Sequence, residues 1–161
     1  EVMDEGLLLV RRLWDAGLAH RDINPANLMV RDSKLLLIDV FFVQVRPSPW
    51  RQAVDLANMM LVLALRTDSK RVYGHALKYF TDEEIAEAFA ATRGVASPTQ
   101  LRAALKRDSR NLLGEFRELA PERKFVAIQR WSVRRFVLGL SVLAVLSLVL
   151  LLVFANWHVV L

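Results

Sequence analysis

The spacing of apolar positions changes several times along this chain, and each spacing predicts a different element. From Val2 to Ala16 the pattern predicts a helix that ends near Gly17, since glycine often follows the last helical turn. Two short apolar runs, Leu28–Val30 and Leu35–Ile38, then flank the polar residues Arg31–Lys34. Because such a pattern is typical of an antiparallel hairpin, we expect one here.

Beyond Trp50 the pattern predicts helices as far as about residue 120. Two of these helices open with a capping box, in which a Ser or Thr hydroxyl and a Glu or Gln side chain satisfy the first backbone N–H groups. In the second box Pro98 takes the first helical position. The expected helices are 50–65, which is dense enough in apolar residues to be buried, 81–91, one opening at 97–100, and 110–119.

Charge is confined to the first part of the chain. All 22 Lys and Arg residues and all 17 Asp and Glu residues lie between positions 1 and 135, and residues 136–154 are almost entirely Leu, Val, Ala and Phe. Because about 20 apolar residues cross the hydrocarbon of a bilayer, we expect a transmembrane helix at 136–155. The alternative is a buried core helix, which would need a larger globular domain around it than this chain supplies.

The flanks of the apolar run predict its orientation. Basic residues gather in a linker at 121–135, and none follows the run in the short tail 156–161. Since basic flanks stay in the cytoplasm, we expect a single-pass protein of the inner or plasma membrane with residues 1–120 in the cytoplasm. The linker is also expected to attract anionic headgroups of the lipid bilayer.

The net charge of +5 does not indicate a nucleic-acid partner. Most of the excess comes from the linker, and the sequence has neither zinc-finger spacing nor a basic ribbon with interleaved aromatic residues. Cysteine is absent, which excludes disulfides and cysteine-ligated metal. The three histidines, at positions 20, 75 and 158, are too scattered to form a ligand set.

Oxygen-bearing side chains flank the predicted hairpin. Asn27 comes directly before its first apolar run and Asp39 directly after its second, so we expect the two to lie side by side at its open end. Magnesium is a hard cation that takes amide and carboxylate oxygens as ligands. Asp22 stands apart from this pair and is available as a base, and Pro25 restricts the backbone between Asp22 and Asn27.

A resemblance to the protein-kinase-like superfamily rests on the segment His20-Arg21-Asp22-Ile23-Asn24-Pro25-Ala26-Asn27 and on Asp39. It covers roughly residues 7–65 and implies a kinase-like C-terminal lobe that uses ATP and Mg²⁺. By this resemblance Asp22 is the catalytic base, and Asn27 and Asp39 bind the metal that accompanies the nucleotide. His20 and Arg21 would hold the loop in shape.

Asp55, near the start of the predicted helix 50–65, resembles the buried helix Asp that binds the backbone of the catalytic loop in kinases. The alternative is an ordinary carboxylate near a helix N-terminus, where the helix dipole favours negative charge. Both interpretations stay open at this point.

The chain also departs from the kinase pattern. Val40 and Phe41 follow Asp39 where kinases have Phe-Gly, and the connection to Asp55 is too short for a long activation segment. This short connection resembles the RIO-type, antibiotic-phosphotransferase-type and lipopolysaccharide-core-kinase-type branches, which lack a docking platform for peptides. The glycine-rich loop, strand lysine and helix glutamate of a nucleotide-binding lobe are not found, so we expect a fragment that begins in mid-fold.

The expected fold is mainly α, with a kinase-like C-terminal lobe that contains one short β-hairpin, plus the transmembrane helix. The expected function is transfer of the ATP γ-phosphoryl group to a hydroxyl acceptor, either a lipid or saccharide-lipid or otherwise a protein serine or threonine. Two alternatives stay open. The chain could be a catalytically inactive, pseudokinase-like membrane scaffold, favoured by the missing glycine after Asp39, or a cytosolic part of a multi-span membrane protein.

Overall fold

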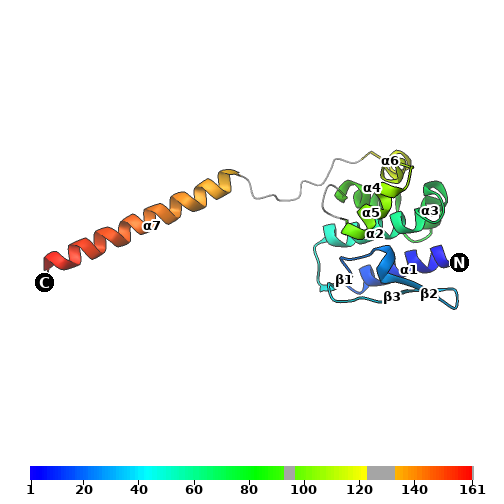
Figure 1. Cartoon of the computed structure of the whole chain (residues 1–161), viewed down its shortest axis with the longest axis horizontal. Helices are drawn as coiled ribbons and strands as arrows, with labels where there is room; N and C mark the ends of the chain where they lie inside the picture. Colours follow the sequence, from blue (N-terminus) through cyan, green and yellow to red (C-terminus); the bar gives the residue numbers. More distant parts are fainter. Residues whose placement is uncertain (93–96, 123–132, 161) are drawn as a thin grey trace. The chain divides into compact units, whose positions relative to one another are not determined.

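Figure 1 shows the computed structural model of the chain, which describes residues 1–92, 97–122 and 133–160. These residues are mainly helical, with two small sheets of two strands each. The chain divides into two compact units, Glu1–Val126 and Ala127–Leu161. The first unit contains both sheets and helices α1 to α6, and the second contains helix α7 (Val133–Val160).

Helix α1 (Val2–Asp15) confirms the first predicted helix. Its end is set by Gly17, which has a φ of +66° and donates its N–H to the carbonyl of Trp14 at 2.9 Å. Glycine takes this left-handed conformation without the steric cost that a Cβ would add. The chain therefore turns sharply after α1 and enters the loop that carries the predicted catalytic residues.

The predicted hairpin is confirmed, with a tighter turn than expected. Strands β2 (Leu28–Arg31) and β3 (Lys34–Leu37) pair antiparallel with Arg31 opposite Lys34, so the turn contains two residues rather than four. Those residues, Asp32 and Ser33, have φ values of +49° and +59°. Two successive positive φ angles characterise the turn whose twist matches that of the flanking strands, which explains why pairing continues up to it.

The prediction of a single hairpin is wrong, because a second two-stranded sheet is present. Strand β1 (Leu18–Ala19) pairs antiparallel with β4 (Gln44–Val45), and the N–H of Arg46 donates to the carbonyl of Gly17 at 2.9 Å. Strands of two residues are too short to produce an alternating sequence pattern. Their pairing depends on the return of the chain after β3, which only the tertiary structure shows.

Helix α2 (Pro49–Ala64) forms the centre of the first unit, and residues 53–64 are all buried. A helix that is buried all round must be covered on several sides, and α2 packs against α1, α3 and α4. The remaining helices of this unit are α3 (Ser69–Ala76), α4 (Asp82–Ala91), α5 (Thr99–Arg107) and α6 (Leu112–Leu119).

The two predicted capping boxes have different outcomes. At the start of α4, Thr81 and Glu84 form the reciprocal pair of hydrogen bonds, which confirms the first box. The second is wrong, because α5 begins at Thr99 without a side-chain cap. The hydroxyl of Ser97 instead donates to Oδ1 of the fully buried Asn58 at 2.8 Å, a partner that lies far away in the sequence.

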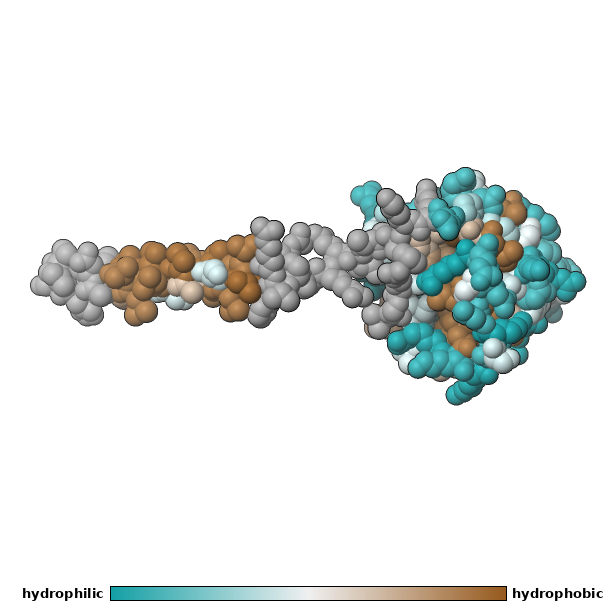
Figure 2. Space-filling model, turned by 90° about the horizontal axis from the view of Figure 1, so that it is seen from above, coloured by the Kyte–Doolittle hydropathy of each residue, from teal (hydrophilic) through white to brown (hydrophobic). Residues whose placement is uncertain are grey.

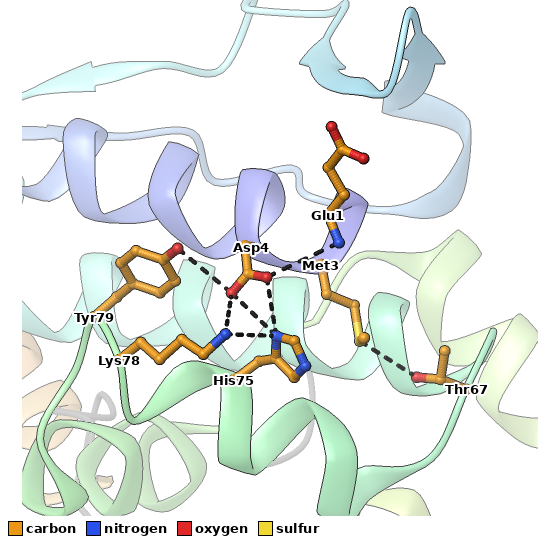
Figure 3. A network of polar contacts seen from close by, with 7 residues as sticks. All are labelled: Glu1, Met3, Asp4, Thr67, His75, Lys78 and Tyr79. Atoms are coloured by element: carbon orange, nitrogen blue, oxygen red, sulfur yellow. Dashed lines mark hydrogen bonds and ion pairs between the residues drawn. The ribbon is translucent and has the colours of Figure 1, made fainter.

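A polar network around Asp4 joins α1 to α3 and the turn that follows it (Figure 3). One carboxylate oxygen of Asp4 lies 3.0 Å from Nδ1 of His75 and accepts a hydrogen bond from Nζ of Lys78 at 3.1 Å. The hydrogen bond to His75 is the main reason why the pKa of Asp4 is lowered. This network is predicted by no local sequence pattern.

The prediction of a transmembrane helix at 136–155 is wrong for the residues that the structure describes. Figure 2 shows much of the described surface of α7 as apolar, and side chains such as Leu143 and Leu151 are exposed. A membrane crossing needs about 20 consecutive apolar residues in one helix. Within the described ranges, no helix combines the length and apolar character that a crossing requires.

Parts of the predicted organisation lie outside the described residues. These are positions 123–132, which make up most of the predicted basic linker 121–135, and the last residue of the predicted tail 156–161.

Candidate active site

The backbone of the loop that carries the predicted catalytic residues is bound by one buried carboxylate. Asp55, in the second turn of α2, is only 2% exposed. Its Oδ2 accepts the N–H of His20 at 2.5 Å, and its Oδ1 accepts the N–H of Arg21 at 2.9 Å. Asp55 thus makes the contact with the loop backbone that the kinase-like resemblance implies.

Asp55 and the loop that it binds each have one unusual property. Burial raises the pKa of Asp55 to about 7, although the N–H groups of Arg21 and His20 favour its ionised form. Arg21 has a φ of +70°, which is uncommon for a residue with a Cβ. We infer that the hydrogen bonds to Asp55 offset the cost of this conformation. The side chain of Arg21 is exposed, so its backbone makes the contact that shapes the loop.

Asp22 and Asn27 are brought into direct contact. Nδ2 of Asn27 donates to Oδ2 of Asp22 at 2.9 Å and to its backbone carbonyl at 3.0 Å. Asn27 ends the 3₁₀ turn η1 (Pro25–Asn27), and this turn carries the chain back towards Asp22 before β2 begins. The five-residue spacing therefore forms a compact turn, where the sequence predicted only a loop.

Asp39 lies at the same end of the hairpin as Asn27. The N–H of Ile38 donates to the carbonyl of Asn27 at 3.1 Å, which extends the strand pairing by one residue. Asp39 is the next residue, is exposed, and accepts the N–H of Phe41 on its Oδ1 at 3.0 Å. The predicted juxtaposition of residues 27 and 39 therefore follows from the observed register of β2 and β3.

The ring of His20 is buried close to the loop. Its side chain is 1% exposed, and neither ring nitrogen makes a hydrogen bond of ordinary geometry. Burial lowers the pKa of His20, while the nearby backbone of Asp39 and the charges of Asp22 and Asp39 oppose this shift. The charges of Asp22 and Asp39 thus both favour the protonated form of His20, against the effect of burial.

Two oxygen atoms at the open end of the hairpin suit a magnesium ion. Because Nδ2 of Asn27 is engaged by Asp22, its Oδ1 is left for another partner, and in the described part of the chain it accepts no hydrogen bond. Oδ2 of Asp39 is likewise free of hydrogen bonds within those residues. Mg²⁺ is commonly held by one or two side-chain oxygens together with substrate phosphates and water. The free oxygens of Asn27 and Asp39 are therefore of the kind that this ion takes as ligands.

The described residues place few possible metal ligands together. Among the described residues, no group of three or more His, Cys, Asp or Glu side chains is placed to hold a metal. Asn27 and Asp39 would accordingly need ligand oxygens from a nucleotide or from water to complete the coordination of Mg²⁺.

Sequence reasoning missed two residues that organise the loop. Nε2 of Gln52 donates to the carbonyls of Trp14 and Leu18 at 3.1 and 3.2 Å, which ties α2 to the chain just before the loop. Asn24 is 2% exposed and contacts both Asp22 and Ala26. An Asn that precedes a proline is a turn signal, and this could have indicated Asn24. No local pattern indicates Gln52.

Comparisons of this chain with models of protein families, with curated proteins and with solved structures found no match. The kinase-like resemblance therefore rests on the residues of the loop and the hairpin.

Proposed function

We propose that this chain carries the catalytic loop and the metal-binding hairpin of a phosphotransferase, which moves the γ-phosphoryl group of ATP to a hydroxyl acceptor. The observation that carries the proposal is the hydrogen bond from Asn27 to Asp22 at the end of the β2–β3 hairpin where Asp39 follows the last paired residue. The amide of Asn27 holds the carboxylate of Asp22, and the strand register brings Asp39 beside Asn27.

Each side chain has a distinct part in this proposal. The Asp22 carboxylate accepts the proton of the acceptor hydroxyl, and it is held ready by hydrogen bonds that do not occupy all of its lone pairs. Asn27 and Asp39 would hold Mg²⁺ through Oδ1 and Oδ2. When bound, this ion supplies charge neutralisation at the phosphate oxygens. Asp55 and His20 keep the loop in place.

Two observations favour a lipid or saccharide-lipid acceptor over a protein serine or threonine. The connection between Asp39 and α2 is short and includes β4, so it offers little length for holding an extended peptide. It also exposes large apolar side chains directly beside Asp39, with Val40 67%, Phe41 84% and Phe42 48% exposed. Such a surface suits an acceptor with an apolar part. The membrane location stays a prediction.

Divalent-ion binding tests the metal part of the proposal on the complete gene product. Mn²⁺, added together with ATP, serves as a probe whose binding is read from the relaxation of water protons. Asp39→Ala should weaken this binding by at least about tenfold, since it removes one of two protein ligands. Asp32→Ala is the matched control, because Asp32 is an exposed carboxylate at the opposite end of the same hairpin and should leave binding unchanged.

Transfer is tested on the complete gene product with ATP labelled in its γ-phosphoryl group and a membrane extract as a source of acceptors. A label that partitions into organic solvent, and that is lost with Asp22→Ala, is the expected result. A label found only in protein would refute the lipid acceptor and leave phosphotransfer standing.

The catalytically inactive scaffold is the second candidate, and the residue after Asp39 favours it. Val40 stands next to Asp39 and Phe41 takes the position at which kinases have a glycine, so the backbone lacks a flexible pivot there. A scaffold would bind Mn²⁺ and ATP equally weakly with and without Asp39→Ala. That outcome, together with no transfer by the complete protein, would contradict the phosphotransferase proposal and support the scaffold.

A further inference from the structure

Asn24 makes all its side-chain hydrogen bonds inside the catalytic loop. Its Oδ1 accepts the N–H of Ala26 at 2.9 Å, and this bond caps the 3₁₀ turn η1. A backbone N–H can only donate, so the orientation of the Asn24 amide is determined and Nδ2 must face the other way. Nδ2 then donates to Oδ1 of Asp22 and to the backbone carbonyl of Asp22, both at 3.1 Å.

The Asp22 carboxylate is consequently held at both of its oxygens. Asn24 donates to Oδ1, and Asn27 donates to Oδ2 at 2.9 Å. The two asparagines differ in what remains free. Asn27 keeps an oxygen available for a metal, whereas Asn24 is 2% exposed and has both amide hydrogens and its oxygen engaged within the loop.

We propose that Asn24 is the positioning residue of Asp22. The inference rests on the proposed function and deepens it, because it names what keeps the base oriented while Asn27 is engaged by the metal. The turn and the base are coupled through one small side chain: Oδ1 of Asn24 fixes the turn, and Nδ2 then fixes the rotation of the Asp22 carboxylate.

This arrangement predicts a specific kinetic signature. Asn24 has no free atom for the nucleotide or the metal, so its loss should leave KM for the Mg²⁺–ATP complex unchanged. Misorientation of the base affects proton transfer only in the transition state, and the effect should therefore appear in kcat.

Two substitutions separate the turn cap from the positioning role. Asn24→Asp keeps an oxygen for the N–H of Ala26 but replaces the donor to Asp22 with a second carboxylate. Asn24→Ala removes both contacts. In the complete protein we expect both variants to lower kcat by about 10- to 100-fold at unchanged KM. Asn24→Ala should also lower the thermal midpoint, because it removes the cap of the turn.

The matched control is Asn111→Asp, because Asn111 caps α6 through Oδ1 to the N–H of Gly114 at 3.1 Å and does not contact the loop. This control should leave kcat unchanged. Wild-type kcat in a folded Asn24→Asp variant would overturn the inference, since it would show that Asn24 acts only as a cap.

A second measurement needs no activity and uses the 161-residue chain. The side-chain NH₂ of Asn24 should be protected from hydrogen exchange in NMR spectra, and Asp22→Ala should reduce this protection while the N–H of Ala26 stays protected. An unprotected NH₂ in the wild-type chain would overturn the inference about Asn24 and leave the proposed function untouched. A protected NH₂ in a complete protein that transfers no phosphoryl group would overturn the proposed function instead.

Discussion

Two backbone N–H groups of the loop after β1, those of His20 and Arg21, donate to the carboxylate of Asp55. These two N–H groups lie in a segment without regular secondary structure, in which Arg21 has a positive φ. A buried N–H without a partner costs about 1–3 kcal/mol. At the residue scale, the conformation of the loop therefore depends on a side chain 34 positions away from Arg21 along the chain.

Asp55→Ala is expected to lower the free energy of unfolding by at least about 2 kcal/mol, because it leaves two loop N–H groups without their acceptor. Urea denaturation followed by circular dichroism measures this loss. A loss below about 0.5 kcal/mol would mean that water replaces Asp55 and that the loop does not depend on it.

The raised pKa of Asp55 also predicts a pH dependence of stability. Its pKa rises from 3.8 to about 7 on folding, so the folded chain holds the proton more tightly than the unfolded chain does. The resulting stability is fully present below pH 3.8 and is lost as the pH rises through about 7. Asp55→Asn should remove this component, which urea denaturation at several pH values would detect. Parallel pH profiles for the wild type and Asp55→Asn would contradict the prediction.

At the scale of elements, α1 lies close to both α2 and β3. A Cβ placed on Gly6 of α1 would lie 3.2 Å from Sδ of Met59 and 3.5 Å from Cδ1 of Leu35. Met59 is fully buried and Leu35 nearly so, and interiors of proteins are closely packed. The close packing of α1 thus contributes to the position of the hairpin that carries Asn27 and Asp39.

Gly6→Val should destabilise the chain by about 1–3 kcal/mol through overpacking at this contact. Gly74→Val is the matched control, because Gly74 also lies within a helix but nothing lies within 4 Å of an added Cβ there. Its effect should stay within about 0.5 kcal/mol. Thermal and urea unfolding would measure both variants. Equal effects of the two substitutions would show that helix propensity outweighs packing at position 6.

At the scale of the whole molecule, the hydrophobic core described by the structure lies entirely in the first unit. Its buried residues run from Leu7 in α1 to Ala120 after α6, and Phe89 stacks on Phe116 with ring centroids 4.6 Å apart. The described side chains of α7 are exposed. The first unit thus has a hydrophobic core of its own.

A chain of residues 1–126 should unfold in urea with the same midpoint and slope as the 161-residue chain. The slope reports the surface exposed on unfolding, so it tests whether the cooperative unit is the same. A shorter chain that ends at residue 111 lacks the buried Leu112 and Phe116 and should lose its cooperative transition. A markedly lower midpoint for residues 1–126 would show that the second unit contributes to the fold.

The sequence by itself determined the elements whose signals are local. The predictions of α1, α2, α4 and the β2–β3 hairpin are confirmed, because periodicity, a capping box and a glycine stop act within a few residues. The expected side-by-side position of Asn27 and Asp39 follows from this hairpin, since strand register is set by a turn of two residues.

The tertiary structure alone decided which distant groups meet. The second sheet, the contact of Asp55 with the loop and the bond from Ser97 to Asn58 all join segments far apart in the sequence. No pattern within a short window contains both partners of such contacts, and their free energy is realised only when the chain closes around α2. For the apolar run after residue 135 a local signal gave a wrong prediction. Its composition indicated a membrane crossing that the described helix does not support.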